Sequence, residues 1–142
     1  MQERRKAREF VVQVSYAHEL LDENLDTTFE RLAVNSNLSK PLLELADAIV
    51  QQSVAHRKEF DEIIRDKSKN WDLDRIAIID RLILRMALAE FFYFEDIPPK
   101  VSISEAIEIA KIYSTTESSS FINGILDAVL NSGLEGEKFK LF

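Results

Sequence analysis

The chain contains no cysteine, and its 142 residues include only three glycines and three prolines. The lack of cysteine excludes a disulfide framework and any thiolate that could bind a metal or act as a nucleophile. It also suits the reducing cytoplasm, where we expect the protein to act. The scarcity of glycine and proline predicts long uninterrupted elements, which helices accommodate best.

Membrane and secretory segments are not evident either. The first five residues carry charge rather than the apolar core of a signal peptide. The most apolar stretch, residues 76–94, is interrupted by Asp80, Arg81, Arg85 and Glu90. Four charges would not be tolerated in a membrane span, so this stretch predicts a buried core helix.

The net charge of −7 argues against a general polyanion binder, but the charge is unevenly distributed. Residues 1–10 contain four cations against two glutamates, a formal charge of +2, which leaves −9 for the remainder. Free N–H groups at the start of a helix and a cationic cluster together attract phosphate. Nucleic acid could therefore bind at this tip alone, and a merely solubilising cluster is the equally weighted alternative.

Apolar residues recur at steps of three and four along most of the chain, and no segment alternates with period two. An all-α fold follows, with helices expected at about residues 3–21, 28–34, 39–63, 76–94, 103–113 and 119–131. Thr27 with Glu30, and Ser102 with Glu105, have the spacing of capping boxes. The central helix is apolar on nearly every face, so other helices or a partner must cover it.

Catalytic and metal-binding motifs are lacking. The two histidines, His18 and His56, lie far apart, and no glycine-rich loop or nucleophile motif occurs. We therefore expect no enzymatic activity, no metal and no cofactor.

The segment 118–127, with the sequence SSSFINGILD, is the most suggestive local pattern. Gly124 falls inside an expected helix, where glycine costs about 1 kcal/mol relative to alanine. Close packing against the central helix is the favoured explanation. The alternative is that the serine-rich turn accepts an RNA backbone and that Phe121 stacks on an unpaired base.

Several blocks resemble the NusB family of bacterial transcription antitermination factors. These blocks are residues 4–9 (RRKARE) and 12–16 (VQVSY), 80–87 (DRLILRMA) with Glu90, Ile97-Pro98, 104–111 (SEAIEIAK) and 121–127 (FINGILD). In order and spacing they span nearly the whole chain, and the last two blocks are the most specific. Only residues 24–70 match weakly.

The resemblance implies a single domain over residues 1–142, built of about six or seven helices in two small packed bundles, residues 1–70 and 71–142. It implies binding of boxA RNA in ribosomal RNA leader transcripts together with NusE, which is ribosomal protein S-ten. It also implies a place in the antitermination complex on RNA polymerase in the bacterial cytoplasm. Homodimerisation is a further property that differs among members.

Residue roles also follow from the resemblance alone. It places RNA contacts at Arg4, Arg5, Lys6, Arg8, Gln13, Tyr16, Glu117, Ser120 and Phe121. It places the protein partner on the central helix, with Asp80 as the candidate for pairing a basic residue. Two positions depart from the family pattern, since Tyr113-Ser114 stands for an aromatic followed by glycine and Ser120 for a lysine.

Two other functions fit the same sequence less well. NusB-like domains resemble the N-terminal part of certain ribosomal RNA methyltransferases, which carry a separate Rossmann-type catalytic domain, whereas this chain has no glycine-rich nucleotide loop. A scaffold that binds only proteins, through the apolar central helix, is the third hypothesis.

Overall fold

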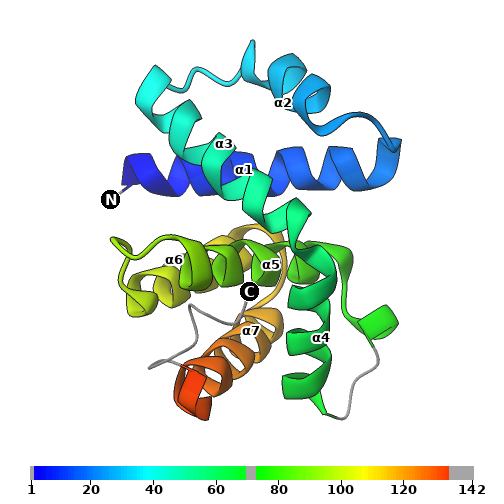
Figure 1. Ribbon diagram of the computed structural model, residues 1–142, viewed down its shortest axis with the longest axis vertical. Coiled ribbons are helices and arrows are strands. Elements are labelled where there is room, and N and C mark those ends of the chain that lie inside the picture. Colours follow the sequence, from blue (N-terminus) through cyan, green and yellow to red (C-terminus); the bar gives the residue numbers. More distant parts are fainter. Residues whose placement is uncertain (1, 70–72, 135–142) are drawn as a thin grey trace.

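The computed structural model describes residues 2–69 and 73–134, and within these residues it contains helices and no strand (Figure 1). The elements are α1 (Gln2–Leu21), α2 (Leu25–Ala33), α3 (Lys40–Ala55), α4 (Arg57–Ser68), the 3-10 turn η1 (Leu73–Arg75), α5 (Ile78–Tyr93), α6 (Pro99–Tyr113), α7 (Thr116–Val129) and the π-helical turn η2 (Leu130–Leu134). The all-α prediction is confirmed. Trp71, expected in the link before the central helix, lies outside the described residues.

The central helix α5 is the element against which most of the others pack. Helices α1, α3, α4, α6 and α7 all contact it, and every residue from Leu82 to Phe92 is buried. A helix that is apolar on all faces must be covered on all faces, as the sequence indicated. The neighbours come from both halves of the chain, which makes α5 the common support of the fold.

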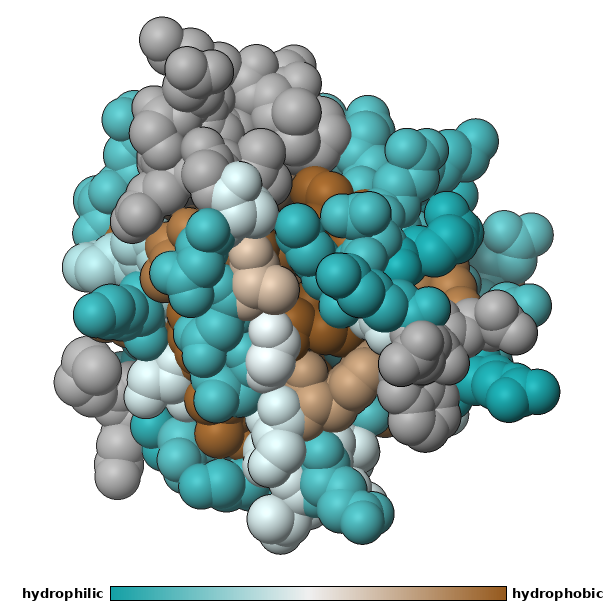
Figure 2. All heavy atoms as spheres, turned by 90° about the horizontal axis from the view of Figure 1, so that it is seen from below, coloured by the Kyte–Doolittle hydropathy of each residue, from teal (hydrophilic) through white to brown (hydrophobic). Residues whose placement is uncertain are grey.

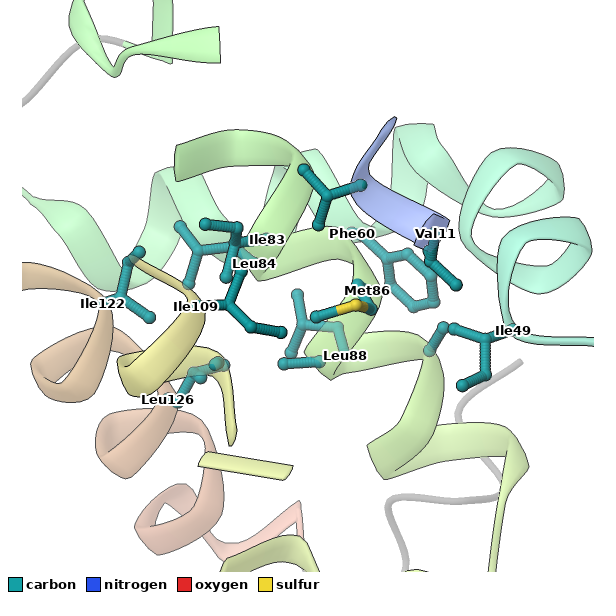
Figure 3. Packing of buried hydrophobic residues seen from close by; sticks show 14 of the residues in the cluster. Val11, Ile49, Phe60, Ile83, Leu84, Met86, Leu88, Ile109, Ile122 and Leu126 are labelled. Atoms are coloured by element: carbon teal, nitrogen blue, oxygen red, sulfur yellow. The ribbon is translucent and has the colours of Figure 1, made fainter. Parts of the chain in front are cut away.

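The hydrophobic core is one continuous cluster. In Figure 3, Met86 and Leu88 of α5 lie between Val11 and Ile49 on one side and Ile109 on the other. Figure 1 shows α1 to α3 in the upper part of the molecule and α4 to α7 in the lower part. The division into two bundles at residue 70 stays a prediction, because the core runs through both parts.

The long helix expected at residues 39–63 is interrupted at His56. Its backbone leaves the helical region (φ −112°, ψ 23°), so α3 ends at Ala55 and α4 starts at Arg57 in a new direction. The His56 ring stacks on Tyr93 with ring centroids 4.7 Å apart. The prediction of one continuous helix is therefore wrong, since periodicity alone does not reveal a change of direction that tertiary contacts stabilise.

Helix starts were predicted with mixed success. Ser39 caps α3 and proline stands in its first turn, as expected. The cap of α2 is Asn24, whose side chain accepts from the Thr27 N–H at 3.1 Å, so the capping box assigned to Thr27 is wrong. The box assigned to Ser102 and Glu105 is also wrong, because α6 already starts at Pro99 and both side chains are buried in its interior.

Gly124 does not pack against the central helix. It is exposed on α7, and a Cβ atom placed there would meet nothing within 4 Å. The expected explanation for this glycine is therefore wrong.

Polar and apolar side chains share the face of the molecule seen from below. Figure 2 shows hydrophilic side chains around apolar residues that are exposed in the middle of this face. No helix in residues 2–69 and 73–134 is long and apolar enough to cross a membrane.

A buried ion pair connects the first helix to the rest of the fold. Arg8, only 2% exposed, donates from Nε to Glu90 Oε2 at 2.7 Å and from Nη2 to Oε1 at 3.0 Å. The Ser102 hydroxyl donates to Glu90 Oε1 at 2.6 Å, so α1, α5 and α6 meet at one carboxylate. Such a pair stabilises only while both partners are present, because either charge alone would be buried without compensation.

Glu90→Gln should therefore destabilise the protein strongly. The substitution preserves the shape of the side chain but leaves the Arg8 charge without its bidentate partner, and we expect a loss of about 3 kcal/mol in the free energy of unfolding. Urea unfolding followed by circular dichroism measures this loss. The control is Glu108→Gln, which removes the exposed pair with Lys111 (3.4 Å) and should cost less than about 1 kcal/mol. Equal small losses in both variants would contradict the structural role of Glu90.

Candidate nucleic-acid interface

The N-terminal end of α1 carries four cations, and the structure divides them into two kinds. Arg4 and Lys6 are exposed, and neither forms an ion pair with any described residue. Arg5 and Arg8 instead face the fold and pair with carboxylates. The available positive charge is therefore smaller than the count of four suggests.

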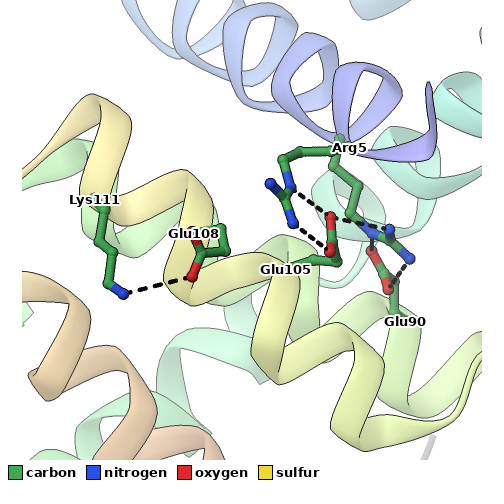
Figure 4. Close-up of polar contacts among 6 residues, drawn as sticks. Arg5, Glu90, Glu105, Glu108 and Lys111 are labelled. Atoms are coloured by element: carbon green, nitrogen blue, oxygen red, sulfur yellow. Dashed lines mark hydrogen bonds and ion pairs between the residues drawn. The ribbon is translucent and has the colours of Figure 1, made fainter. Parts of the chain in front are cut away.

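Arg5 is both ion-paired and partly exposed. Its Nε and Nη2 donate to the two oxygens of Glu105 at 2.9 Å each (Figure 4). The side chain of Arg5 remains 27% exposed, whereas that of Glu105 is 2% exposed. Arg5 thus presents one edge to solvent while the other edge neutralises a buried carboxylate.

Arg8 does not lie at a solvated helix end, and the expectation that it does is wrong. Its Nε and Nη2 atoms donate to Glu90, and its Nη1 atom lies 3.8 Å from Glu105 Oε1. RNA could reach this side chain only by displacing the buried pair. Arg8 therefore holds α1 in place rather than offering charge at the surface.

The pairing of Arg5 with Glu105 shifts the acidity of both groups. The hydrogen bonds and the positive charge of Arg5 lower the pKa of the Glu105 carboxyl below its usual value, despite partial desolvation. The same hydrogen bonds raise the pKa of Arg5 further. Both groups are therefore charged near neutral pH, and their attraction joins α1 to α6.

Gln13 and Tyr16 lie farther along α1, and both are exposed. Gln13 Nε2 donates to the Tyr113 hydroxyl at 3.5 Å, and that hydroxyl donates to Glu9 Oε1 at 3.1 Å. Desolvation is the main cause that raises the pKa of Tyr113. These bonds bring the end of α6 beside the middle of α1, so the loop after α6 lies next to the exposed part of α1.

The loop and first turn of α7 present the remaining predicted RNA residues. Glu117 and Ser120 are exposed, and Phe121 is half-buried. Thr115 caps α7 by accepting from the Ser118 N–H at 2.9 Å, which fixes the position of this turn. The serine-rich segment is therefore largely the start of a helix rather than an open loop.

A cavity of about 440 Å³ brings the loop together with the start of α5. Glu117 and Phe121 line it from one side and Asp80 from the other. Asp80 is 5% exposed, and its Oδ1 atom has no hydrogen-bond partner within the described ranges. A buried carboxylate oxygen without a donor is unusual in folded proteins.

Sequence reasoning missed the buried carboxylates Glu90 and Glu105. Both lie in helices among other buried residues. A charged residue within an otherwise apolar stretch was the sequence signal that could have indicated a buried ion pair. No group of three or more metal-binding side chains occurs within residues 2–69 and 73–134.

Arg5→Gln should reduce stability at neutral pH but not in strong acid. Because the pKa of Glu105 is lowered in the folded protein, its contribution is present above the ordinary value of 4.5 and is lost as the pH falls through the folded value. Urea unfolding at a series of pH values should show a difference between wild type and variant that shrinks on acidification. The Arg4→Gln control should show no such pH dependence, and a constant difference for Arg5→Gln would contradict the pairing.

Proteins named NusB are among the known proteins with similar sequences. The NusB family model matches residues 5–131. The transcription antitermination protein NusB of Salinibacter ruber is 43% identical over 131 residues, which cover 92% of this chain and 82% of that protein. NusB of Trichlorobacter lovleyi is 44% identical over 124 residues, covering 87% of each.

Solved structures agree with this similarity. NusB from T. maritima superposes with a TM-score of 0.85 at 35% identity, covering 97% of both chains. A chain from a crystal structure of the antitermination factors NusB and NusE in complex with double-stranded RNA has a TM-score of 0.83 at 27% identity, covering 93% of this chain and 98% of that one. The same helical framework thus accompanies the sequence match, and the chain belongs to the NusB family.

Proposed function

We propose that this chain is a transcription antitermination factor that binds boxA RNA of ribosomal RNA leader transcripts together with NusE. The observation that carries the proposal is the set of exposed side chains on α1 of an otherwise acidic protein. Arg4 and Lys6 supply cations at its N-terminal end, and Gln13 and Tyr16 lie on the face that Lys6 shares. The other predicted contacts lie at the cavity between the starts of α5 and α7. The relatives named NusB, and the complex of NusB with NusE and RNA, support it.

In this proposal the RNA backbone meets Arg4, Lys6 and the exposed edge of Arg5. Arg8 is assigned a positioning role, because its buried pair with Glu90 fixes the helix that carries the other three. Gln13 and Tyr16 then offer an amide and an aromatic face to bases that follow along α1. An electrostatic contribution from about three cations is small, so the partner has to supply much of the affinity.

The loop contact consists of Glu117, Ser120 and Phe121. Phe121 supplies a face for stacking on an unpaired base, and Ser120 supplies a hydroxyl but no charge where the family commonly has lysine. The attraction for phosphate is therefore concentrated on α1, and the loop contributes mainly through the base.

Asp80 is proposed to receive a basic side chain of NusE. Its carboxylate is buried, and one oxygen lacks a donor, so a cation from a partner would complete its hydrogen bonds. We further propose that the protein works in the bacterial cytoplasm within the antitermination complex on RNA polymerase and that it catalyses no reaction.

The RNA contact of α1 predicts a reduced salt dependence for Arg4→Ala. The slope of log K against log salt for single strands changes by about 0.7 for each phosphate contact, so the variant should have a slope shallower by that amount. Fluorescence anisotropy with a labelled single-stranded boxA RNA, in the presence of NusE, measures this slope at several salt concentrations. Arg65→Ala, which removes an exposed cation on α4, is the matched control.

The same experiment can refute the proposed function. Equal affinity of the wild-type complex for boxA and for a scrambled RNA of the same length would refute boxA recognition. An unchanged slope in Arg4→Ala would show that this arginine is only a solubilising charge.

Asp80→Asn should weaken binding of NusE by at least about tenfold. The amide keeps the volume but removes the charge that a basic partner side chain needs, and buried charge pairs at interfaces contribute about 2 kcal/mol or more. Isothermal titration calorimetry of the two proteins measures the change. Asp74→Asn, an exposed carboxylate in η1, should bind NusE like wild type. Normal binding by Asp80→Asn would remove Asp80 from the interface.

A further inference from the structure

A second cavity, of about 350 Å³, opens at the other end of α1. It lies between the end of α1, the start of α4 and the start of α5, and its lining consists of charged side chains and one histidine. None of the residues predicted to bind RNA or the partner lines it. Its chemistry is therefore separate from the cavity at Asp80.

Two of the three carboxylates in the lining are occupied by one arginine. Arg85 Nε and Nη2 each donate to Asp61 at 2.8 Å, and Arg85 Nη1 lies 3.3 Å from Glu19 Oε1. These pairs support the floor of the cavity, because Arg85 is 5% exposed and joins α1, α4 and α5. Because Arg85 has one charge and the two carboxylates have two, this group retains a formal charge of −1 beside the other cations.

Three cations of the lining have no ion pair with any residue that the structure describes: Arg57, Lys58 and Arg81. The Nε atom of Arg81 is buried and has no hydrogen-bond acceptor among the described residues. Asp22 is the remaining carboxylate. Over the whole lining, four arginine and lysine side chains face three carboxylates, so the cavity has a formal charge of +1 on a chain whose net charge is −7.

A buried arginine N–H without an acceptor needs an anion or a water to accept its hydrogen bond. The planar guanidinium matches the geometry of a phosphate in particular. Arg57 and Lys58 are exposed at the rim, where they can approach the same ligand from a second helix. We propose that this cavity binds a backbone phosphate of the RNA strand beyond the part that lies along α1. The proposal rests on the proposed function, since the ligand is a further segment of the same RNA.

The position of the cavity indicates that its phosphate comes from the same RNA strand that meets α1. Glu19 and Tyr16 are three residues apart on α1, so they are neighbours on its surface. A strand that follows the exposed face of Lys6, Gln13 and Tyr16 therefore arrives at the rim of the cavity. Arg81 follows Asp80 directly, and a step of one residue turns the helix by about 100°, which separates the two cavities around the start of α5.

The test compares a double variant with a matched control of equal charge. Arg57→Gln combined with Lys58→Gln removes two exposed cations of the rim, whereas Arg65→Gln combined with Lys69→Gln removes two exposed cations from the far end of the same helix. The affinity of each complex with NusE is measured by anisotropy for a single-stranded RNA that contains boxA, and for the same RNA shortened in steps from each end. Arg81→Gln is added as a second probe, with its thermal unfolding recorded to establish that it folds.

We expect the rim variant to lose one phosphate contact. Its salt slope should be shallower by about 0.7, which corresponds to about fivefold weaker binding at 0.1 M salt relative to a 1 M reference. Arg81→Gln should show the same loss, and the control should bind like wild type. When the RNA is shortened from the end that reaches the cavity, wild type and rim variant should bind it with equal affinity.

Four other results would overturn the proposal, each in its own way. Normal affinity in the rim variant together with weakened binding in Arg4→Ala would leave the proposed function intact and reject the cavity as an RNA site. No RNA binding by the wild-type complex would reject both. Weaker binding of NusE without any change for RNA would assign the cavity to an acidic protein segment. Thermal stabilisation of wild type by inorganic phosphate, lost in the rim variant while RNA affinity is unchanged, would assign it to a free anion.

Discussion

The buried ion pair between Arg8 and Glu90 is the constraint on which the rest of the structure depends. A charged arginine in the interior requires a carboxylate in fixed geometry, and Glu90 supplies both oxygens. Because Ser102 donates to the same carboxylate, the register of α1, α5 and α6 is set at one point. The exposed side chains on α1 and the loop after α6 take their relative positions from this point.

The candidate interface is assembled from parts of the chain that are far apart in sequence. Arg5 and Glu105 are 100 residues apart, and Gln13 and Tyr113 are separated by the same number. These contacts place α6 along α1, so that the end of α6 lies beside Gln13. The side chains proposed to meet RNA are thus positioned by the packing of two helices.

Periodicity and composition were sufficient for the class of fold and for the central helix. The apolar residues of α5 cover all its faces, and the structure buries them on all faces. The break at His56 was not predictable, because no glycine or proline marks it and the ring that His56 stacks on, that of Tyr93, lies far along the chain. Ser102 and Glu105 were misread for a similar reason, since the spacing of a cap also occurs where a buried network requires a hydroxyl and an acid.

The candidate site, like the fold, was predictable only in part. Sequence pattern and resemblance together selected the cationic start of α1, and the structure leaves Arg4 and Lys6 exposed there. They failed to separate Arg8 from its neighbours, because a pattern along one helix does not show which of four cations meets a carboxylate on another. The unpartnered atoms of Asp80 and Arg81 had no signal in the sequence, since they are defined by what surrounds them.

The anchoring of α1 has a consequence for the affinity of the proposed RNA contact. A cationic segment that is disordered before binding must lose conformational freedom when it meets its ligand, and this loss weakens affinity. Here Arg5 and Arg8 tie the helix to α6 and α5 before any ligand arrives. In the proposed complex the entropic cost of ordering therefore falls on the flexible nucleic acid and not on this helix.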